Sequence, residues 1–509
     1  MLLLLLQRDG EKQLNKFLTI QYLKKAGVTT CLFLYLTICS AQQKEWLGEE
    51  SLYESYSLAL NLRIKEAREQ LKEAKTPEQI YVASLTDAIE LLMTEDKRKF
   101  DQFENSFIQR LELLEEILHP AAESLFTMAE LRLYWAFIYL KFGHEFDAAW
   151  NFRQAYLTVQ ECKIKYPAFL PIKKTSGLLE IILGSIPEKY HWLMSLLNMD
   201  GSVETGLNEL EQVRSQSTSQ YVETTLLYYL FHAYILPRTS IAMQGFDELL
   251  RTETNNRLVL FLGGSVAIKN SESEKALGYF QKVNENNNGI IVPYASHQLG
   301  EVYLHKGAYE LSIESYQTFL ATYEGRTYVK DAYYKIGICY WLMNNKTEAG
   351  KYFEKAKEEG KESAEADKYA ARSLAENLYP NIKLLKIRYA TDGGYYDEAK
   401  NIISSVGDED LITSKEKIEF TYRKARLFHK SGSLNEARVN YLETIRKQGE
   451  ENWYFAPNAC LQLGYLLVDQ RQPKEARKYF EKALSYKKHE YKNSIDSKAK
   501  SAFAQLKKK

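Results

Sequence analysis

The sequence predicts an all-α protein, an α-solenoid of about eleven antiparallel helix hairpins. Residues 294–359 contain two similar copies, in which Gly300 and Gly337 occupy the same position 37 residues apart. Gly (25) and Pro (10) are both scarce in a chain of 509 residues, which favours helices over loop-rich or β architectures. Apolar residues also recur at intervals of three, four and seven residues, as expected for amphipathic helices.

Each copy in residues 294–359 contains two predicted helices. The first helix carries a glycine where the helices cross, and the second carries small and aromatic residues on one face. These residues are Ser312, Tyr316 and Phe319 in one copy, and Ala349, Phe353 and Ala356 in the other. This pattern resembles the tetratricopeptide repeat, which has a period of about 34 residues. A hairpin of this length cannot bury its apolar face alone, so the resemblance implies a superhelical stack.

The N-terminal segment, residues 1–41, is typical of a secretory signal peptide with a long lead-in. Two lysines precede the 13-residue apolar run Ala26 to Ile38, and a Cys-Ser-Ala sequence follows it. As a helix this run would reach about 20 Å, which is short of a bilayer core of about 30 Å. We expect cleavage after Ala41 and an exported protein, periplasmic or associated with the cell envelope. Lipidation of Cys39 is a weaker alternative, because bulky Ile38 precedes it.

The charge composition does not indicate a polyanionic partner. The 67 Lys and Arg residues balance the 67 Asp and Glu residues, so no net field directs the chain to nucleic acid or an acidic membrane. Only residues 498–509 are locally basic, and we interpret them as a solvated terminal helix rather than a docking patch. Beyond residue 41 the cysteines are Cys162, Cys339 and Cys460, which we interpret as buried thiols without a disulfide framework.

The N-terminal region, residues 42–170, contains further predicted hairpins. A helix pair is predicted over residues 46–75, and apolar-periodic segments follow at 80–93 and 100–118. The clearest repeat of this region comes next, with its crossing residue at Ala136.

Residues 171–210 interrupt this pattern with four glycines inside apolar helical segments. The block resembles the tetratricopeptide repeat protein 39 family and the yeast Iml2-type proteins, in which a glycine-containing helix leads through a Ser/Pro turn and a leucine-rich helix to two further glycines. The corresponding positions here are held by Ser185, Pro187, Leu193, Leu197, Gly201, Gly206 and Leu207. Asn198 departs from the expected glycine. The resemblance implies a helical scaffold without known chemistry of its own.

The middle repeats occupy residues 211–360, and the C-terminal repeats occupy residues 361–493. A polar insertion opens the second of these regions and lengthens the step to its first hairpin. Two clear copies close the array, with crossing residues Ala425 and Gly464 39 residues apart. Residues 494–509 are predicted to form the polar capping helix that such a stack needs for solubility.

No catalytic, cofactor-binding or metal-binding signature is present in the sequence. It contains no P-loop, no G-x-S-x-G nucleophile elbow and no H-E-x-x-H zinc helix. His297 and His305 lie eight residues apart, about two helical turns, which is too far to share one metal ion. We therefore expect a non-catalytic protein. The alternative is an enzyme whose paired acids come together from distant segments, because such a pair leaves no local motif.

The inner face of the stack is the predicted functional site, because the first helix of each hairpin lines it in this repeat class. Aromatic residues, His and Arg gather at its inward positions, and such residues dominate binding hot spots. The candidate groove residues are Tyr294, His297, Glu301, His305, Tyr334, Trp341, Tyr422, Arg426, His429 and Tyr465. The alternative for each ring is that it packs against the next repeat.

The function that these observations favour is an exported scaffold that binds a protein or peptide partner in its concave groove. No cofactor and no nucleic acid are expected. A membrane-associated or lipid-handling scaffold is the alternative, suggested by the glycine-broken apolar segment 177–197 and by the family resemblance.

Overall fold

The computed structural model describes residues 46–507 apart from 72–73, 187–196, 237, 286–287, 363 and 377–378. Within these residues it contains 24 α-helices and no β-strand, so the all-α prediction is confirmed. None of the helices in the described part is long and apolar enough to cross a membrane. The predicted signal peptide, residues 1–41, lies outside the described residues, as do Pro187 and Leu193.

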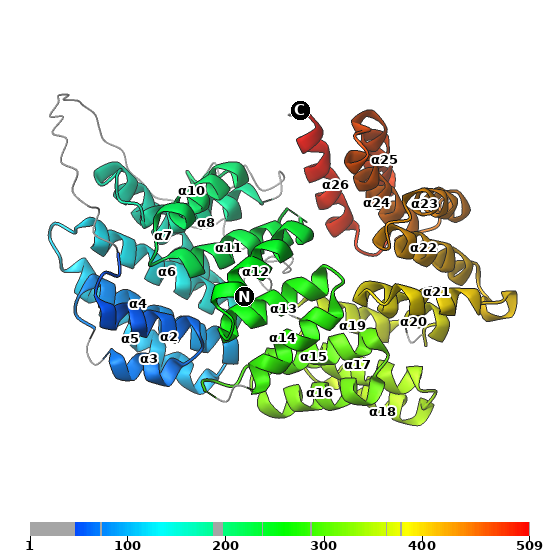
Figure 1. Cartoon of the computed structure of the whole chain (residues 1–509), viewed down its shortest axis with the longest axis horizontal. Coiled ribbons are helices and arrows are strands. Elements are labelled where there is room, and N and C mark those ends of the chain that lie inside the picture. The colour runs from blue at the N-terminus through cyan, green and yellow to red at the C-terminus, as the bar shows by residue number, and fades with distance from the viewer. Residues whose placement is uncertain are drawn as a thin grey trace.

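The helices follow one another as hairpins along a curved array (Figure 1). The first twelve are α2 (Glu50–Leu60), α3 (Ile64–Gln70), α4 (Pro77–Thr94), α5 (Lys97–Glu115), α6 (Ala122–Phe142), α7 (Glu145–Lys165), α8 (Ile172–Gly184), α10 (Val203–Gln216), α11 (Tyr221–Tyr234), α12 (Thr239–Thr252), α13 (Arg257–Lys269) and α14 (Ser273–Glu285). The next twelve are α15 (Pro293–Lys306), α16 (Tyr309–Thr322), α17 (Val329–Leu342), α18 (Lys346–Glu358), α19 (Glu365–Ala375), α20 (Ile382–Gly393), α21 (Tyr396–Ser404), α22 (Ser414–Lys430), α23 (Leu434–Gln448), α24 (Phe455–Asp469), α25 (Pro473–Ser485) and α26 (Lys492–Lys507). Neighbouring helices pack in pairs, from α6–α7 to α24–α25, which confirms the predicted solenoid of helix hairpins.

Local sequence signals set the ends of several helices. Thr76 caps α4 by accepting a hydrogen bond from the backbone N–H of Gln79, and Pro77 occupies the first turn, where no N–H is needed. Gly143 and Gly307 end α6 and α15 in the left-handed conformation, with φ angles of 93° and 81°. These turns bring the next helix back along the one before it.

Close packing within each hairpin depends on the small crossing residues. A Cβ atom added at Gly300 on α15 would lie 2.7 Å from the ring of Tyr316 on α16. One added at Gly337 on α17 would lie 2.6 Å from the ring of Phe353 on α18. A larger residue would push these helices apart, because a packed interior has no room for such overlap. The repeated positions in the sequence are therefore the positions where the helices touch.

The glycines of residues 171–210 serve another close crossing, between α8 and α10. A Cβ atom added at Gly177 would lie 2.7 Å from the carbonyl oxygen of Gly206, and one at Gly206 would lie 2.4 Å from that of Gly177. The two backbones are in direct contact, so any side chain at either position would separate them. This requirement explains why the block departs from the pattern of the neighbouring repeats.

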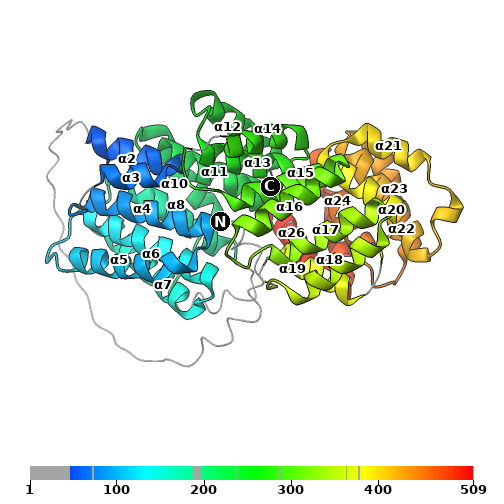
Figure 2. The ribbon, with the colours of Figure 1, turned by 90° about the horizontal axis from the view of Figure 1, so that it is seen from below.

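The array bends back on itself after α18. Helix α19 packs against α17, and α20 packs against α15 and α13. We call residues 365–393, which form these two helices, the fold-back segment. Because of this bend the last hairpins stand beside the middle ones, and both views place α26 between α24 and α11 (Figure 1, Figure 2).

Candidate functional site

The ten predicted groove residues fall into two groups by burial. The buried group is Tyr294, His297, His305, Tyr334 and Tyr422. The partly exposed group is Glu301, Trp341, Arg426, His429 and Tyr465. The neighbours of each residue explain the difference.

Tyr294, at the start of α15, belongs to a buried polar network that reaches the N-terminal hairpins. Its hydroxyl donates to the carboxylate of Glu95 beyond α4 and lies 2.7 Å from the hydroxyl of Tyr323. The ammonium of Lys141 on α6 donates to the Tyr294 hydroxyl over 2.9 Å and pairs with Glu95 over 2.6 Å. Burial and the charge of Glu95 raise the pKa of Tyr294 well above its usual value. The network therefore joins α4, α6 and α15 within the protein.

His297 takes part in a second buried network, which anchors the fold-back segment. Its Nε2 lies 2.9 Å from a carboxylate oxygen of Asp331 on α17. The carboxylate of Asp367, on α19, accepts the backbone N–H groups of Asp331 over 3.0 Å and of Tyr328 over 2.9 Å. Burial and the negative charge of Asp331 raise the pKa of Asp367 to about 7, although these backbone bonds favour the ionised form.

The charge of Glu301 is neutralised within the same region. Lys335 pairs with Glu301 and lies 3.0 Å from a carboxylate oxygen of Asp331. Burial alone would raise the pKa of Glu301, but Lys335 and His305 outweigh it and hold that pKa well below its usual value. A partner would find no unpaired carboxylate at Glu301.

The fold-back segment covers the inner wall of the middle repeats. The ring of Tyr369 on α19 meets that of Tyr334 edge-on, with centroids 6.0 Å apart. On α20, the ring of Tyr389 lies 6.1 Å from that of His305. The side chains predicted to line a groove on α15 and α17 thus contact the chain itself. A separate partner would reach the buried ones only if this segment moved.

The last hairpins keep part of the predicted surface accessible. Arg426 on α22 donates to the side-chain oxygen of Gln462 on α24 over 2.9 Å. The Nδ1 atom of His429 lies 3.0 Å from the hydroxyl oxygen of Tyr441. Desolvation, together with the positive charges of Arg426 and Lys430, lowers the pKa of His429 to about 4. His429 is therefore neutral at physiological pH. With Tyr465 on α24, these residues form a partly exposed patch on the first helices of two successive hairpins.

Three lysines absent from the predicted set lie near this patch, namely Lys269 at the end of α13, Lys430 at the end of α22 and Lys498 on α26. We call them the inner lysine cluster. Desolvation, with the positive charges of Lys498 and Lys430, lowers the pKa of Lys269 to about 8. Desolvation and Arg426 lower the pKa of Lys430 and that of Lys498. The sequence signals for the cluster are the place of Lys430 beside His429 and the basic composition of residues 498–509.

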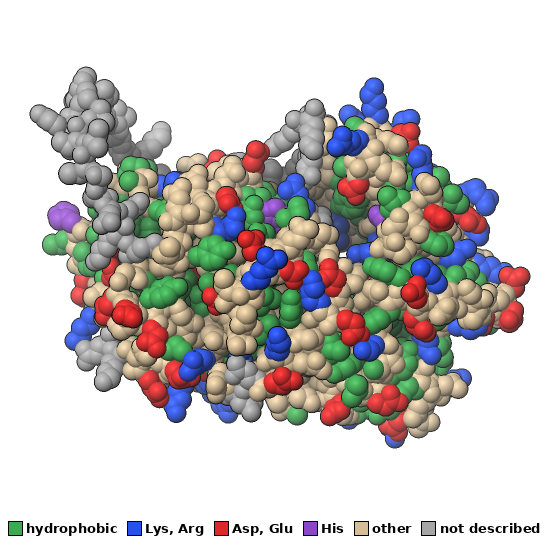
Figure 3. All heavy atoms as spheres, in the orientation of Figure 1, with side chains coloured by type: hydrophobic (Ala, Val, Ile, Leu, Met, Phe, Trp, Pro, Cys, Tyr) green, Lys and Arg blue, Asp and Glu red, His purple; other side chains and the backbone are tan. Residues whose placement is uncertain are grey.

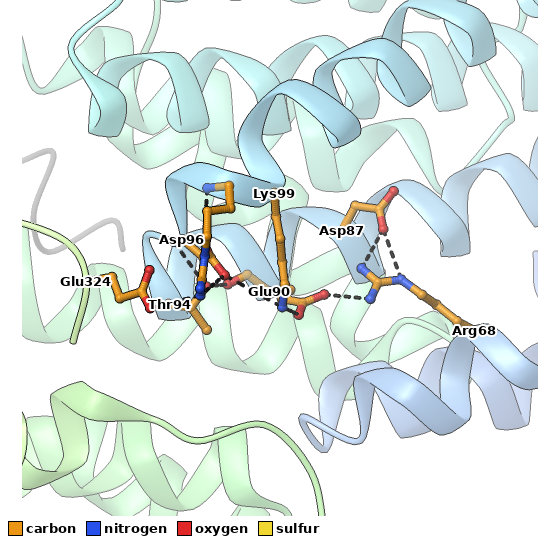
Figure 4. A network of polar contacts seen from close by, with 8 residues as sticks. Arg68, Asp87, Glu90, Thr94, Asp96, Lys99 and Glu324 are labelled. Carbon is orange, nitrogen blue, oxygen red and sulfur yellow. Dashed lines mark hydrogen bonds and ion pairs between the residues drawn. The ribbon is translucent and has the colours of Figure 1, made fainter. Parts of the chain in front are cut away.

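A separate charged network joins α3, α4 and α5 (Figure 4). Arg68 pairs with Asp87 over 2.7 Å and with Glu90 over 2.6 Å, and Lys99 also pairs with Glu90. Beside this network lies an open cavity of about 300 Å³, lined by Ile64, Lys65, Arg68, Glu69, Glu90 and Ile290. Because both buried carboxylates have cationic partners, we assign this network to the packing of the three helices.

Two features of the described residues bear on chemistry, namely the grouping of possible metal ligands and the state of the thiols. Among them, no group of three or more His, Cys, Asp or Glu side chains is placed to hold a metal ion. Cys162, Cys339 and Cys460 are free and buried, and desolvation raises the pKa of each thiol to about 12. Thiols in this state are poor nucleophiles.

Comparison with known proteins identifies repeats in the chain. A family model described as "Tetratricopeptide repeat" matches residues 330–359 and 457–490. These ranges coincide closely with the hairpins α17–α18 and α24–α25. The chain thus carries tetratricopeptide repeats, which are generally non-catalytic scaffolds for protein interaction.

Several solved structures are similar at low identity. The MamA protein is 19% identical, with 40% of this chain and 98% of that chain covered and a TM-score of 0.28. A tetratricopeptide repeat protein from Parabacteroides merdae is 17% identical, with coverages of 55% and 98% and a TM-score of 0.25. The human IFIT1 dimer with m7Gppp-AAAA is 12% identical, with coverages of 86% and 95% and a TM-score of 0.32. No curated protein matches the sequence, so the resemblance of residues 171–210 to the repeat protein 39 family stays a prediction.

Proposed function

We propose that this chain, which carries tetratricopeptide repeats, is an exported, non-catalytic scaffold that binds a protein or peptide partner on the inner face of its last hairpins. The observation that carries the proposal is the accessibility of Arg426, His429 and Tyr465 on α22 and α24. The corresponding side chains of the middle repeats are mostly buried or in contact with the fold-back segment. The tetratricopeptide repeats at residues 330–359 and 457–490 support the same class of function, because such repeats are generally scaffolds for protein interaction.

The residue types in this patch suit the recognition of a polypeptide. Arg426 donates one N–H group to Gln462 and also interacts with the Tyr441 hydroxyl, so its guanidinium is held in place, and its other N–H groups suit carbonyl or carboxylate groups of a partner. Tyr465 packs edge-on against Phe480, with centroids 5.6 Å apart, so its ring is fixed before a partner binds. A rigid aromatic ring beside an arginine is a common composition for a binding hot spot.

A capture experiment with matched variants tests this proposal. The full chain is immobilised and exposed to an extract of its source organism, and the bound proteins are identified and quantified. The variant Arg426→Gln with Tyr465→Ser should lose the partner, because both changes remove inner-face contacts. The matched control is Arg438→Gln with Tyr479→Ser, which makes the same changes on the second helices α23 and α25.

Comparison of the two variants distinguishes partner binding at the inner face from binding elsewhere on the surface. Capture by the control but not by the inner-face variant supports the proposal, provided that both keep the far-UV helical signal. Equal capture by the two variants excludes binding at this patch. For export, fractionation of cells and N-terminal sequencing should find the chain outside the cytoplasm and starting after Ala41. A cytoplasmic chain that keeps residues 1–41 would contradict export without affecting the binding proposal.

A further inference from the structure

The inner lysine cluster comes from helices that are distant in sequence but brought together by the bend of the array. The turn that follows α20 lies against the end of α13, since a Cβ atom added at Gly394 would lie 2.1 Å from the carbonyl oxygen of Ser271. Helix α22 packs on α20, and α26 packs on α24 and α25. This arrangement places Lys269, Lys430 and Lys498 around one surface at the junction of the middle and last hairpins.

None of these lysines forms an ion pair with a described residue. In the part of the chain that the structure describes, no carboxylate lies within ion-pair distance of their ammonium groups. Lys269 instead lies over the ring of Tyr234, with its Nζ 4.5 Å from the ring centroid. By contrast, Lys306 at the end of the neighbouring helix α15 pairs with Glu274 over 2.8 Å. The ammonium groups of the cluster therefore have no carboxylate partner, whereas that of Lys306 nearby does.

The cluster is both accessible and enclosed. The side chains of Lys269 and Lys498 are exposed, and that of Lys430 is partly exposed. Desolvation nevertheless lowers the pKa of each lysine. In the space-filling view the surface is hollowed beside the last hairpins, and Lys or Arg side chains lie along the wall of the hollow (Figure 3). Mutual repulsion in such a place is relieved when an anion binds.

We propose that the inner lysine cluster binds an acidic segment of the partner protein, with Asp or Glu carboxylates facing Lys269, Lys430 and Lys498. This inference rests on the proposed function, because the cluster adjoins Arg426 on the same inner face. It names the chemistry of the partner, namely a peptide stretch rich in carboxylates.

A peptide fits this surface better than a nucleic acid. Asp392, at the end of α20, lies close enough to Lys430 and Arg426 to favour their charged forms, and the sugar–phosphate backbone of DNA has no hydrogen-bond donor for this carboxylate. A peptide can donate backbone N–H groups to such a carboxylate while its acidic side chains face the lysines. The chain also has no net charge, so it lacks the broad positive field typical of nucleic-acid binding.

Fluorescence anisotropy with defined probes tests the inference. The probe is a short labelled peptide of alternating Ser and Glu, compared with an uncharged peptide of alternating Ser and Gln and with single-stranded oligothymidylate of equal length. The test variant is Lys269→Gln, Lys430→Gln and Lys498→Gln. The control variant is Lys65→Gln, Lys351→Gln and Lys400→Gln, whose side chains are 90%, 61% and 50% exposed and lie on other helices. Both variants change the net charge equally.

We expect the wild-type chain and the control variant to bind the Ser-Glu peptide and not the Ser-Gln peptide. The test variant should bind the acidic peptide about tenfold more weakly, as expected for the loss of three partly screened ion pairs. Added salt should weaken the wild-type interaction in the same direction. The helical signal and thermal midpoint of each variant show whether it is folded.

Other outcomes overturn the inference. Equal weakening in the test and control variants would mean that only net charge matters, and absence of peptide binding would exclude the site. Tighter binding of oligothymidylate than of the peptide, lost in the test variant, would assign the cluster to nucleic acid instead. The proposed function fails separately. If the Arg426 and Tyr465 variant loses its captured partner while the lysine variant keeps it, the scaffold function stands and the acidic-segment inference fails.

Discussion

The indole N–H of Trp341 donates to the backbone carbonyl of Pro380 over 2.8 Å. Trp341 lies near the end of α17, and Pro380 lies two residues before α20. The ring of Tyr379 adds a contact, with its centroid 4.7 Å from that of Trp341. A side chain predicted to bind a partner is therefore engaged by the chain's own backbone. This contact helps to hold the fold-back segment over the middle repeats.

Replacement of Trp341 by Phe should loosen the fold-back segment without preventing partner capture. Phe keeps a ring but leaves the Pro380 carbonyl without its donor, which should cost about 1 kcal/mol of stability. Relative to the wild type, amide hydrogen exchange should become faster in residues 365–393 and stay unchanged in α22–α25. The control is Trp453→Phe, because no hydrogen bond from the Trp453 indole is found. Loss of capture in the Trp341 variant alone would show instead that this ring contacts the partner.

Glycine-to-alanine changes should have opposite effects on stability at a helix crossing and away from one. Gly300→Ala should destabilise the protein by about 1–3 kcal/mol, because its Cβ atom would overlap the ring of Tyr316. Gly278 lies inside α14 with no atom within 4 Å of an added Cβ atom. Gly278→Ala should therefore stabilise the protein by about 0.5–1 kcal/mol through helix propensity.

Urea unfolding followed by far-UV circular dichroism measures both glycine changes. The two variants should shift the midpoint in opposite directions from the wild type. If Gly300→Ala also raises the midpoint, helix propensity rather than the helix crossing dominates at Gly300. That result would remove the physical basis of the repeat alignment.

The repeats could be predicted from sequence because their determinants are local. Gly300 and Tyr316, or Gly337 and Phe353, stand within one hairpin, so spacing alone shows which residues will touch. A groove lined by α15 and α17 is expected only if the regular stacking continues unchanged past the insertion at residue 361. The structure shows that the chain turns back there, so that Tyr369 and Tyr389 reach side chains of the middle repeats.

Contacts between distant segments had no signal of this kind. Lys174 on α8, Glu130 on α6 and Glu223 on α11 form a buried ion cluster, and no local pattern distinguishes them from solvated charges. The inner lysine cluster is similar, because Lys269 and Lys498 come near enough to repel each other only after the whole array has curved. The bend is set by packing of α20 on α15, a long-range property that periodicity does not encode.

The buried ion cluster predicts a large effect for Lys174→Met. The Lys174 ammonium lies 2.8 Å from carboxylate oxygens of both Glu130 and Glu223 and is almost fully buried. Burial disfavours its charge, but the two carboxylates outweigh this and raise the pKa of Lys174. Removal of the cation leaves the buried Glu130 and the partly buried Glu223 without a cationic partner, which should cost about 3–5 kcal/mol.

A compensating variant shows whether charge causes this loss. Glu130→Gln and Glu223→Gln, added to Lys174→Met, remove the uncompensated charges and should restore much of the urea midpoint. If the triple variant is no more stable than Lys174→Met, the loss would be due to packing. A wild-type midpoint for Lys174→Met would exclude the cluster as a stabilising element.

The raised pKa of Asp367 predicts that its contribution to stability grows as the pH falls. Its value of about 7 in the folded protein lies above the usual value in an unfolded chain, about 3.9. Between these values the folded protein holds a proton that the unfolded chain has released, so a fall in pH favours folding. The contribution is fully present near the lower value and is lost as the pH rises through about 7.

Asp367→Asn isolates this effect, because the amide does not titrate while the other ionisable groups stay the same. On lowering the pH from about 8 to about 6, the wild type should gain about 1 kcal/mol more unfolding free energy than the variant. Urea titrations at several pH values measure that difference. A pH-independent loss of stability caused by the Asn side chain does not affect it. Parallel curves would show that Asp367 titrates at its ordinary value. A wild-type curve that falls relative to the variant on acidification would mean that the backbone N–H groups of Tyr328 and Asp331 stabilise the ionised carboxylate more than burial opposes it.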